Sequence, residues 1–257
     1  MQTLKFVLQG FFMQTTTRIN LWSSPRNIST AMMYSFAQRG DTVVFDEPLY
    51  AHYLLSTGIH HPGKEEILQV QDNNGENVIR EIILADHGKS ISFFKQMTHH
   101  LENINFDFLS QAKNILFIRD PKQIIASYAQ VRKDVTMQDV GIKKQWWLYN
   151  YLTEKKLSCI VLDSNEILRS PQNVLQQLCD ALQISFIEKM LHWPAGEKSY
   201  DGVWAKYWYD NVHQSTGFAK QKTSERDLPA YLEPLYKECR FYYDQLFPYS
   251  IKINVGY

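Results

Sequence analysis

The chain has 257 residues, 27 basic and 27 acidic side chains, and a formal net charge of zero. Its length is enough to bury a full hydrophobic core, and its hydrophobic content of 44% argues against a disordered chain. No run of basic residues is longer than two, which argues against a general nucleic-acid-binding protein. No apolar run approaches the length of a membrane span, so we expect neither a nucleic acid nor a membrane as a partner.

The cysteines and the N-terminus give two further expectations. The cysteines are Cys159, Cys179 and Cys239. Their odd number, wide separation and lack of metal-ligand spacing indicate reduced residues of a cytoplasmic protein. Residues 1–16 are predicted to be an N-terminal extension without a functional role, with Met13 as an alternative start to Met1. Residues 17–257 are predicted to form a single α/β domain.

A strand, a short polar loop and a helix follow one another near the start of this domain. Ile19–Trp22 is predicted to end a buried strand, and Ala31–Gln38 has no Gly or Pro to interrupt a helix. The loop between them, Ser23–Thr30, carries Arg26 and several hydroxyl side chains. Since the first amides of a helix have no internal partner and lie at the positive end of its dipole, the pattern predicts a phosphate or sulfate site.

This loop differs from the ordinary phosphate loop, Gly-x-x-x-x-Gly-Lys-[Ser/Thr], because it lacks both the glycines and the lysine. The difference argues against an ordinary ATPase or GTPase. Pro25–Thr30, Pro-Arg-Asn-Ile-Ser-Thr, resembles the Pro-Arg-Ser-Gly-[Ser/Thr]-Thr form of the 5′-phosphosulfate loop of sulfotransferases. The resemblance implies that the loop binds the phosphosulfate of 3′-phosphoadenosine 5′-phosphosulfate. The residues concerned are Ser24, Arg26, Asn27, Ile28, Ser29 and Thr30. The alternative is a polar turn that only caps a helix.

A second resemblance lies about a hundred residues further along. Asn114–Ile118 is predicted to be a buried strand, and it leads directly into Arg119-Asp120-Pro121 and a helix. Sulfotransferases bind the cofactor's 3′-phosphate through an Arg-[Asn/Asp]-Pro…Ser-Tyr segment. The resemblance therefore implies that Arg119 and Ser127 bind this phosphate. The alternative is an Arg that caps a strand and a Ser that faces a neighbouring helix.

The rest of the chain alternates strands and helices. Further strands are predicted at 42–46, 90–95 and 157–162, a long helical stretch at 137–156, another helix from 163 onward, and surface helices within 62–86. Repeated βα units predict a mostly parallel sheet with helices on both faces, and the family resemblance implies a P-loop NTPase-like architecture. Ligands of such sheets bind beyond the carboxyl ends of the strands. Four polar residues are expected there: Arg26, Glu47, Lys95 and Arg119.

Glu47 is the preferred candidate for the catalytic base, because some bacterial and tyrosine-modifying sulfotransferases place a Glu at this point. The strand before it is expected to neighbour the first loop. The resemblance also implies that Lys95 stabilises the bridging oxygen of the donor, with His99 and His100 lining the acceptor pocket. One of these histidines is the alternative base, as in the Lys-Thr-His segment of cytosolic sulfotransferases. Asp46 is expected either to cap a helix or to raise the pKa of its neighbour.

The C-terminal third is rich in aromatic residues. The segment 201–218 is predicted to be a lid over the cofactor, and Lys206, Lys220 or Lys222 is expected to give the 3′-phosphate a second cation. The aromatic residues between Tyr231 and Tyr243 are predicted to be core. The histidine pairs 60–61 and 99–100 lack further ligands at a suitable spacing, so we predict no metal site.

The expected function is that of a sulfotransferase, with the resemblance covering roughly residues 17–220. It would transfer a sulfuryl group from 3′-phosphoadenosine 5′-phosphosulfate to a hydroxyl or amine of a small molecule, and leave adenosine 3′,5′-bisphosphate. The alternatives are a P-loop-type kinase of a small metabolite and a non-catalytic nucleotide-binding protein of the same fold. A homodimer is a candidate assembly.

Overall fold

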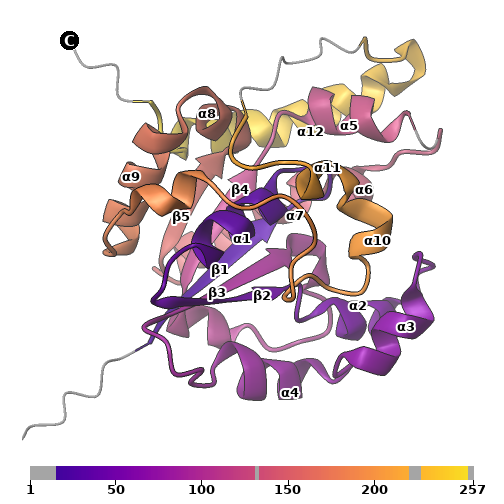
Figure 1. Ribbon diagram of the computed structural model, residues 1–257. Coiled ribbons are helices and arrows are strands. Elements are labelled where there is room, and N and C mark those ends of the chain that lie inside the picture. The colour runs from indigo at the N-terminus through magenta and orange to yellow at the C-terminus, as the bar shows by residue number, and fades with distance from the viewer. Residues whose placement is uncertain (1–15, 131–132, 220–226, 254–257) are drawn as a thin grey trace, which may run out of the picture.

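The computed structural model describes residues 16–130, 133–219 and 227–253 (Figure 1). In these residues five strands form one parallel sheet in the order β2-β3-β1-β4-β5. The strands are β1 (Thr17–Ser23), β2 (Thr42–Asp46), β3 (Ile91–Met97), β4 (Lys113–Ile118) and β5 (Cys159–Asp163). The predicted α/β fold with a parallel sheet is therefore confirmed. The predicted extension, residues 1–16, lies outside the described residues except for Thr16.

Helices connect the strands and follow the last one. Before β4 they are α1 (Ser29–Ala37), α2 (Tyr50–Thr57), α3 (Lys64–Val70), α4 (Gly75–Val78), the π-helix η1 (Ile79–Ile83) and the 3₁₀ turns η2 (Thr98–His100) and η3 (Asp107–Gln111). After β4 come α5 (Pro121–Tyr128), α6 (Met137–Val140), α7 (Ile142–Glu154), α8 (Ser164–Arg169), α9 (Pro171–Leu182), α10 (Ala205–Trp208), α11 (Asp210–His213) and α12 (Glu233–Leu246). The remaining 3₁₀ turns are η4 (Glu188–Leu191), η5 (Ala230–Leu232) and η6 (Phe247–Tyr249).

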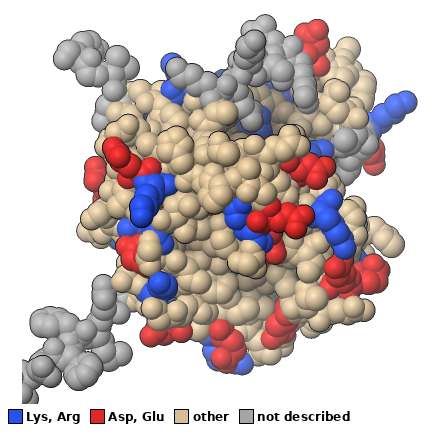
Figure 2. Space-filling view, in the orientation of Figure 1, with Lys and Arg blue, Asp and Glu red and all other residues tan. Residues whose placement is uncertain are grey.

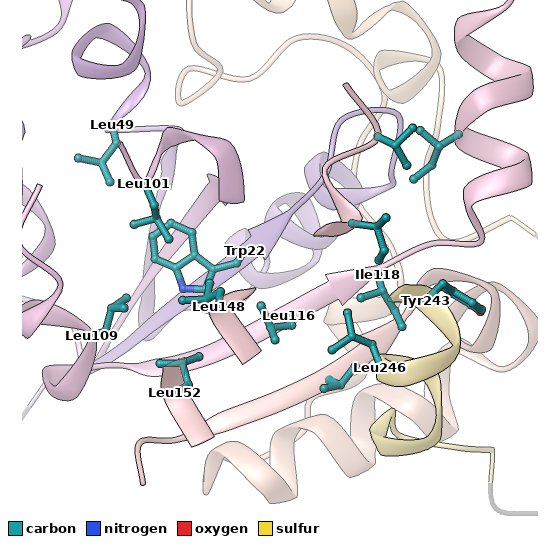
Figure 3. Packing of buried hydrophobic residues seen from close by; sticks show 14 of the residues in the cluster. Trp22, Leu49, Leu101, Leu109, Leu116, Ile118, Leu148, Leu152, Tyr243 and Leu246 are labelled. Atoms are coloured by element: carbon teal, nitrogen blue, oxygen red, sulfur yellow. The ribbon is translucent and has the colours of Figure 1, made fainter. Parts of the chain in front are cut away.

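The sheet is covered by helices on both faces, as predicted. Because successive strand residues point to opposite faces, Trp22 and Leu116 pack on one side while Leu21 and Phe117 pack on the other. The first side is covered by α5, α7 and α12, as the close view in Figure 3 shows for Leu148 and its neighbours. The second is covered by α1 and α9. Both faces are buried, which leaves the ends of the strands as the place for chemistry.

Two predicted helical stretches are interrupted. The stretch 137–156 divides into α6 and α7 at Gly141, whose φ of 73° is left-handed and ends the first helix. A capping box between Thr136 and Asp139 starts α6. The stretch that begins at 163 likewise divides into α8 and α9, and Pro171 is the first residue of the second helix.

The order of the strands corrects one expectation about the site. We expected the strand before Glu47 to neighbour the first loop, but β3 lies between β2 and β1. The strands on either side of β1 are β3 and β4, and β3 ends at Met97 rather than at Lys95. Lys95 consequently lies inside its strand, on the side of the sheet that carries α1, and not beyond the strand's end.

The helices of residues 62–86 were predicted to lie on the surface, and they do so on one side only. Ile67, Val78 and Ile83 are fully or almost fully buried. In the view of Figure 2, basic and acidic side chains are interspersed over the face shown. None of the helices that the structure describes combines the length and the apolar composition needed to cross a membrane.

Candidate active site

The loop between β1 and α1 is held to the neighbouring strand by Asn27. Its side-chain Nδ2 donates to the carbonyl of Phe117 in β4 at 3.0 Å, and its Oδ1 accepts from the amide of Ile28 at 2.8 Å. These two bonds fix the turn without the glycine found in the sulfotransferase form of the loop. The Ser24 hydroxyl is buried, and it has no hydrogen-bond partner within the described part of the chain.

Arg119 meets this loop although it lies 93 residues away in sequence. Its Nη1 donates to the carbonyl of Arg26 at 2.5 Å, and its Nε donates to Gln123 at 2.9 Å. The Arg26 guanidinium in turn lies 5.4 Å from the ring centre of Tyr128, at the end of α5. Ser127 occupies the preceding position of that helix and is partly buried. The structure thus brings the two predicted nucleotide-binding segments together.

The N-terminus of α1 opens onto the same loop. No side chain caps this helix, and its first turn contains no acidic residue. Ser29 and Thr30, in that turn, are buried. The first amides of the helix therefore have no side-chain partner, the buried Ser24 hydroxyl beside them has none among the described residues, and the positive end of the helix dipole favours an anion here. These donors fit the phosphosulfate group that the sequence predicted.

Lys95, in β3 next to the strand that leads into the loop, is buried and only 1% exposed. Its ammonium donates to Asp46 Oδ1 at 2.9 Å, to the Tyr209 hydroxyl at 2.6 Å and to Glu47. Burial alone would lower the pKa of Lys95, but the charges of Asp46 and Glu47 outweigh it and raise this pKa well above its usual value. Lys95 is therefore a fixed positive charge. Thr98, just after β3, ties this strand to the start of the loop, because its hydroxyl donates to the Ser23 carbonyl at 3.1 Å.

Glu47 directly follows β2 and is also buried. Its φ of 45° is left-handed, a costly conformation for a residue other than glycine, and Arg26 shares it with a φ of 56°. Burial raises the pKa of Glu47 to about 7; the Lys95 charge opposes this rise and the Asp46 charge adds to it. A carboxylate with this pKa can accept a proton near neutral pH. The sequence correctly predicted a raised pKa here, but burial rather than the second carboxylate is its main cause.

The two histidines pack beside Glu47 as rings. His100 is stacked between Tyr50 and Tyr53, with ring centres 4.8 and 4.9 Å away, and its Nε2 lies 3.8 Å from Glu47 Oε2. Burial lowers the pKa of His100 well below its usual value and that of His99 to about 3. Both rings are therefore neutral near pH 7. Neither ring nitrogen of His100 has a hydrogen-bond partner among the residues described.

The aromatic segment from Asp201 to Tyr209 covers this cluster (orange in Figure 1). Asp46 Oδ2 accepts from the Gly202 amide at 3.0 Å and from the Tyr209 hydroxyl at 2.8 Å. The buried Trp204 indole donates to the same hydroxyl at 3.3 Å. Asp46 is thus not a helix cap, contrary to one expectation, since α2 begins with Leu49 as its N-cap and no side-chain cap.

The second cation predicted for the 3′-phosphate is not provided by Lys206. This side chain is exposed and forms an ion pair with Glu66 at 2.5 Å. Lys220 and Lys222 lie outside the described residues. Of the aromatic residues predicted as core near the C-terminus, Tyr243 is buried, whereas Tyr231 and Phe241 are more than half exposed. In the part of the chain that the structure covers, no three His, Cys, Asp or Glu side chains gather to hold a metal ion.

The sequence did not predict that Tyr209 and Asp46 bind the Lys95 ammonium. Tyr209 lies 114 residues after Lys95, and nothing in its neighbourhood distinguishes it from the other aromatic residues of the segment. The adjacency of Asp46 to Glu47 could have predicted this contact, because two neighbouring carboxylates that are buried at a strand end need a cation beside them.

Comparison with known proteins identifies the family. A model of the sulfotransferase domain matches residues 17–240, so the chain belongs to the sulfotransferase domain family. Two curated Arabidopsis thaliana proteins, branched-chain-amino-acid aminotransferase-like proteins 1 and 2, are 38% and 36% identical to it over 212 and 222 residues. These matches cover 82% and 86% of this chain but 38% and 40% of the relatives, so the chain spans about two fifths of their length.

Solved structures show the same fold. A sulfotransferase domain from the curacin biosynthetic pathway covers 90% of this chain and 98% of its own, with a TM-score of 0.53 and 16% identity. The sulfotransferase domain of the Synechococcus PCC 7002 olefin synthase covers 92% and 96%, with a TM-score of 0.55 and 18% identity. The predicted sulfotransferase architecture is therefore confirmed.

Proposed function

We propose that this protein transfers a sulfuryl group from 3′-phosphoadenosine 5′-phosphosulfate to a hydroxyl or amine of a small molecule. One observation carries the proposal: the loop before the uncapped N-terminus of α1 lies close to a buried Lys95–Glu47 pair, and Thr98 links the two. Family membership supports the transfer reaction. The contact between Arg119 and the loop supports a donor that carries phosphate at both the 5′ and the 3′ position of its ribose.

The residues would act in separate roles. Arg26 and the first amides of α1 would hold the phosphosulfate, and Arg119 and Ser127 the 3′-phosphate. Glu47 would take the proton of the acceptor while the acceptor's oxygen or nitrogen bonds to sulfur. The bond from sulfur to the bridging oxygen breaks, and the buried positive charge of Lys95 would stabilise the negative charge left on that oxygen through its field, because its three hydrogens are donated to Asp46, Glu47 and Tyr209. Such a transfer needs positioning and charge stabilisation more than covalent help from the protein.

The acceptor would lie near His100, whose unpaired ring nitrogens can bond a hydroxyl or amine. His99 would line the same side. A single domain over residues 17–257, a cytoplasmic location and a homodimer remain proposals. We propose no aminotransferase activity, because this chain matches only about two fifths of the relatives so named and is itself matched by the sulfotransferase domain model.

Radiolabelled 3′-phosphoadenosine 5′-phosphosulfate with a panel of phenols, alcohols and amines tests the proposal. We expect label to pass to at least one acceptor class in the presence of a chelator, because no proposed step uses a metal. Transfer of phosphate from ATP that requires magnesium would instead indicate the kinase alternative. Nucleotide binding without any transfer would indicate the non-catalytic alternative.

Arg26→Lys tests the proposed role of the loop. The substitution keeps the charge but loses the planar fork that binds two phosphate oxygens at once. Losing one charge-assisted hydrogen bond costs about 1.5–3 kcal/mol, so we expect affinity for adenosine 3′,5′-bisphosphate to fall at least about tenfold. Calorimetric titration measures this, and circular dichroism checks that the fold is kept. Equal affinity in the two proteins would show that Arg26 only shapes the turn.

A further inference from the structure

Asp46 has no role in the transfer as proposed, yet Lys95, Tyr209 and the Gly202 amide all donate hydrogen bonds to it. We propose that Asp46 is a positioning residue: it shares the Lys95 ammonium with Glu47 and thereby leaves Glu47 free to take a proton. The inference rests on the proposed function of Glu47. It concerns how the base is kept basic, not which reaction the base serves.

The contacts of Asp46 show that it acts through its neighbours. Its Oδ1 accepts from Lys95 at 2.9 Å, and its Oδ2 accepts from the Gly202 amide at 3.0 Å. The single Tyr209 hydroxyl hydrogen is donated to this carboxylate, with the hydroxyl oxygen 3.0 Å from Oδ1 and 2.8 Å from Oδ2. Its side chain is 2% exposed. Both oxygens are therefore occupied and covered, so Asp46 cannot contact an acceptor or a nucleotide in this arrangement.

The charges of the cluster explain what Asp46 does to Glu47. The ionisable groups that face Glu47 are Asp46 from β2, Lys95 from β3, His100 from η2, Tyr50 from α2 and Tyr209 after α10. One ammonium serves two carboxylates, so the ionised cluster carries one excess negative charge. Lys95 contacts Glu47 with or without Asp46, so removing the Asp46 charge leaves a simple Lys95–Glu47 ion pair. The like charge that raises the pKa of Glu47 is then lost, and this pKa falls.

The covering segment supplies the bonds that hold Asp46 in place and also offers a matched control. Asp201 begins this segment and anchors it to α1, since its oxygens accept from Tyr34 at 2.8 Å and from His213 at 3.0 Å. Within the described residues, Asp201 forms no hydrogen bond or ion pair with Lys95 or Glu47. Removing either acidic charge disturbs the same segment, but only Asp46 bears on the charge balance of Glu47.

The test compares Asp46→Asn, Asp46→Glu and Asp201→Asn with the unmodified protein. Infrared difference spectra of the carboxyl band titrate Glu47 directly, and subtraction of the Glu47→Gln spectrum identifies its signal. The acidic limb of the kcat/KM profile gives a second reading. For the unmodified protein we expect the infrared midpoint and the acidic limb to lie near pH 7. Activity should be present above this pH and lost below it.

We expect Asp46→Asn to move the midpoint and the limb down by about one unit or more. Asp46→Glu, which keeps the charge, and Asp201→Asn should leave them near pH 7. Asp46→Ser is equally uncharged and gives the same test should the Asn variant not fold. An unmoved midpoint in a folded uncharged variant, or an equal shift in Asp201→Asn, would overturn the proposal. The infrared titration needs no turnover, so a failure of sulfuryl transfer is seen separately.

Discussion

Glu47→Gln is expected to lower turnover by about 10²–10⁴-fold, the usual contribution of a positioned general base. Glutamine keeps the size and hydrogen-bonding capacity of the side chain but cannot take a proton. Because burial raises the pKa of Glu47 to about 7, the unmodified enzyme should gain activity as pH rises through this value. The variant should lose that dependence. Single-turnover rates across this pH range, with an acceptor found by the panel, measure both effects.

Nucleotide affinity and the two histidines provide the controls for this variant. Glu47→Gln should leave affinity for adenosine 3′,5′-bisphosphate almost unchanged, because Glu47 is not in the loop. His99→Ala and His100→Ala should cost less and act mainly on KM for the acceptor, since burial lowers both pKa values far below neutrality. If a histidine variant loses the rate while Glu47→Gln keeps it, a histidine is the base.

Arg119→Ala is expected to weaken binding of adenosine 3′,5′-bisphosphate by about tenfold to 150-fold. This range follows from losing a charge-assisted contact worth about 1.5–3 kcal/mol. Arg119 also supports the loop through the Arg26 carbonyl, so part of the loss comes from a looser turn. Titration calorimetry with adenosine 3′,5′-bisphosphate and with AMP separates the two contributions.

A looser loop lowers the affinity for both nucleotides equally, whereas a lost 3′-phosphate contact lowers only the affinity for adenosine 3′,5′-bisphosphate. The ratio of the two affinities should therefore collapse in Arg119→Ala. Ser127→Ala, on the same helix, should reduce the ratio less, because a neutral hydrogen bond contributes less than a charged one. A ratio that Arg119→Ala leaves intact would remove Arg119 from the 3′-phosphate site.

Much of the fold could be predicted because its signals are local. The apolar run before Arg119 is a buried strand, and the Asp120 cap with Pro121 starts α5 as expected: the carboxylate accepts from the Lys122 amide at 2.9 Å. The break at Gly141 was missed, although a glycine within a helical stretch was a visible warning. Strand order was not predictable, since it depends on contacts between distant segments.

The candidate site, like the fold, has a part that local sequence motifs predict and a part that depends on contacts between distant residues. The loop and the strand end at Arg119 carry their own motifs, so their residues could be proposed from the sequence. The geometry of Lys95, Asp46 and Tyr209 could not, because their hydrogen bonds join residues 49, 114 and 163 positions apart. The left-handed backbone at Arg26 and Glu47 has no sequence signal either, since neither residue favours it.

The central claim is that the loop and Arg119 together bind a donor nucleotide phosphorylated at both its 5′ and 3′ positions. Calorimetric titration of the unmodified protein with adenosine 3′,5′-bisphosphate and with AMP, at one salt concentration and without metal, tests it most directly. The account predicts that adenosine 3′,5′-bisphosphate binds about tenfold or more tightly than AMP, through the charge-assisted contact of Arg119. Equal affinity for the two nucleotides would contradict it.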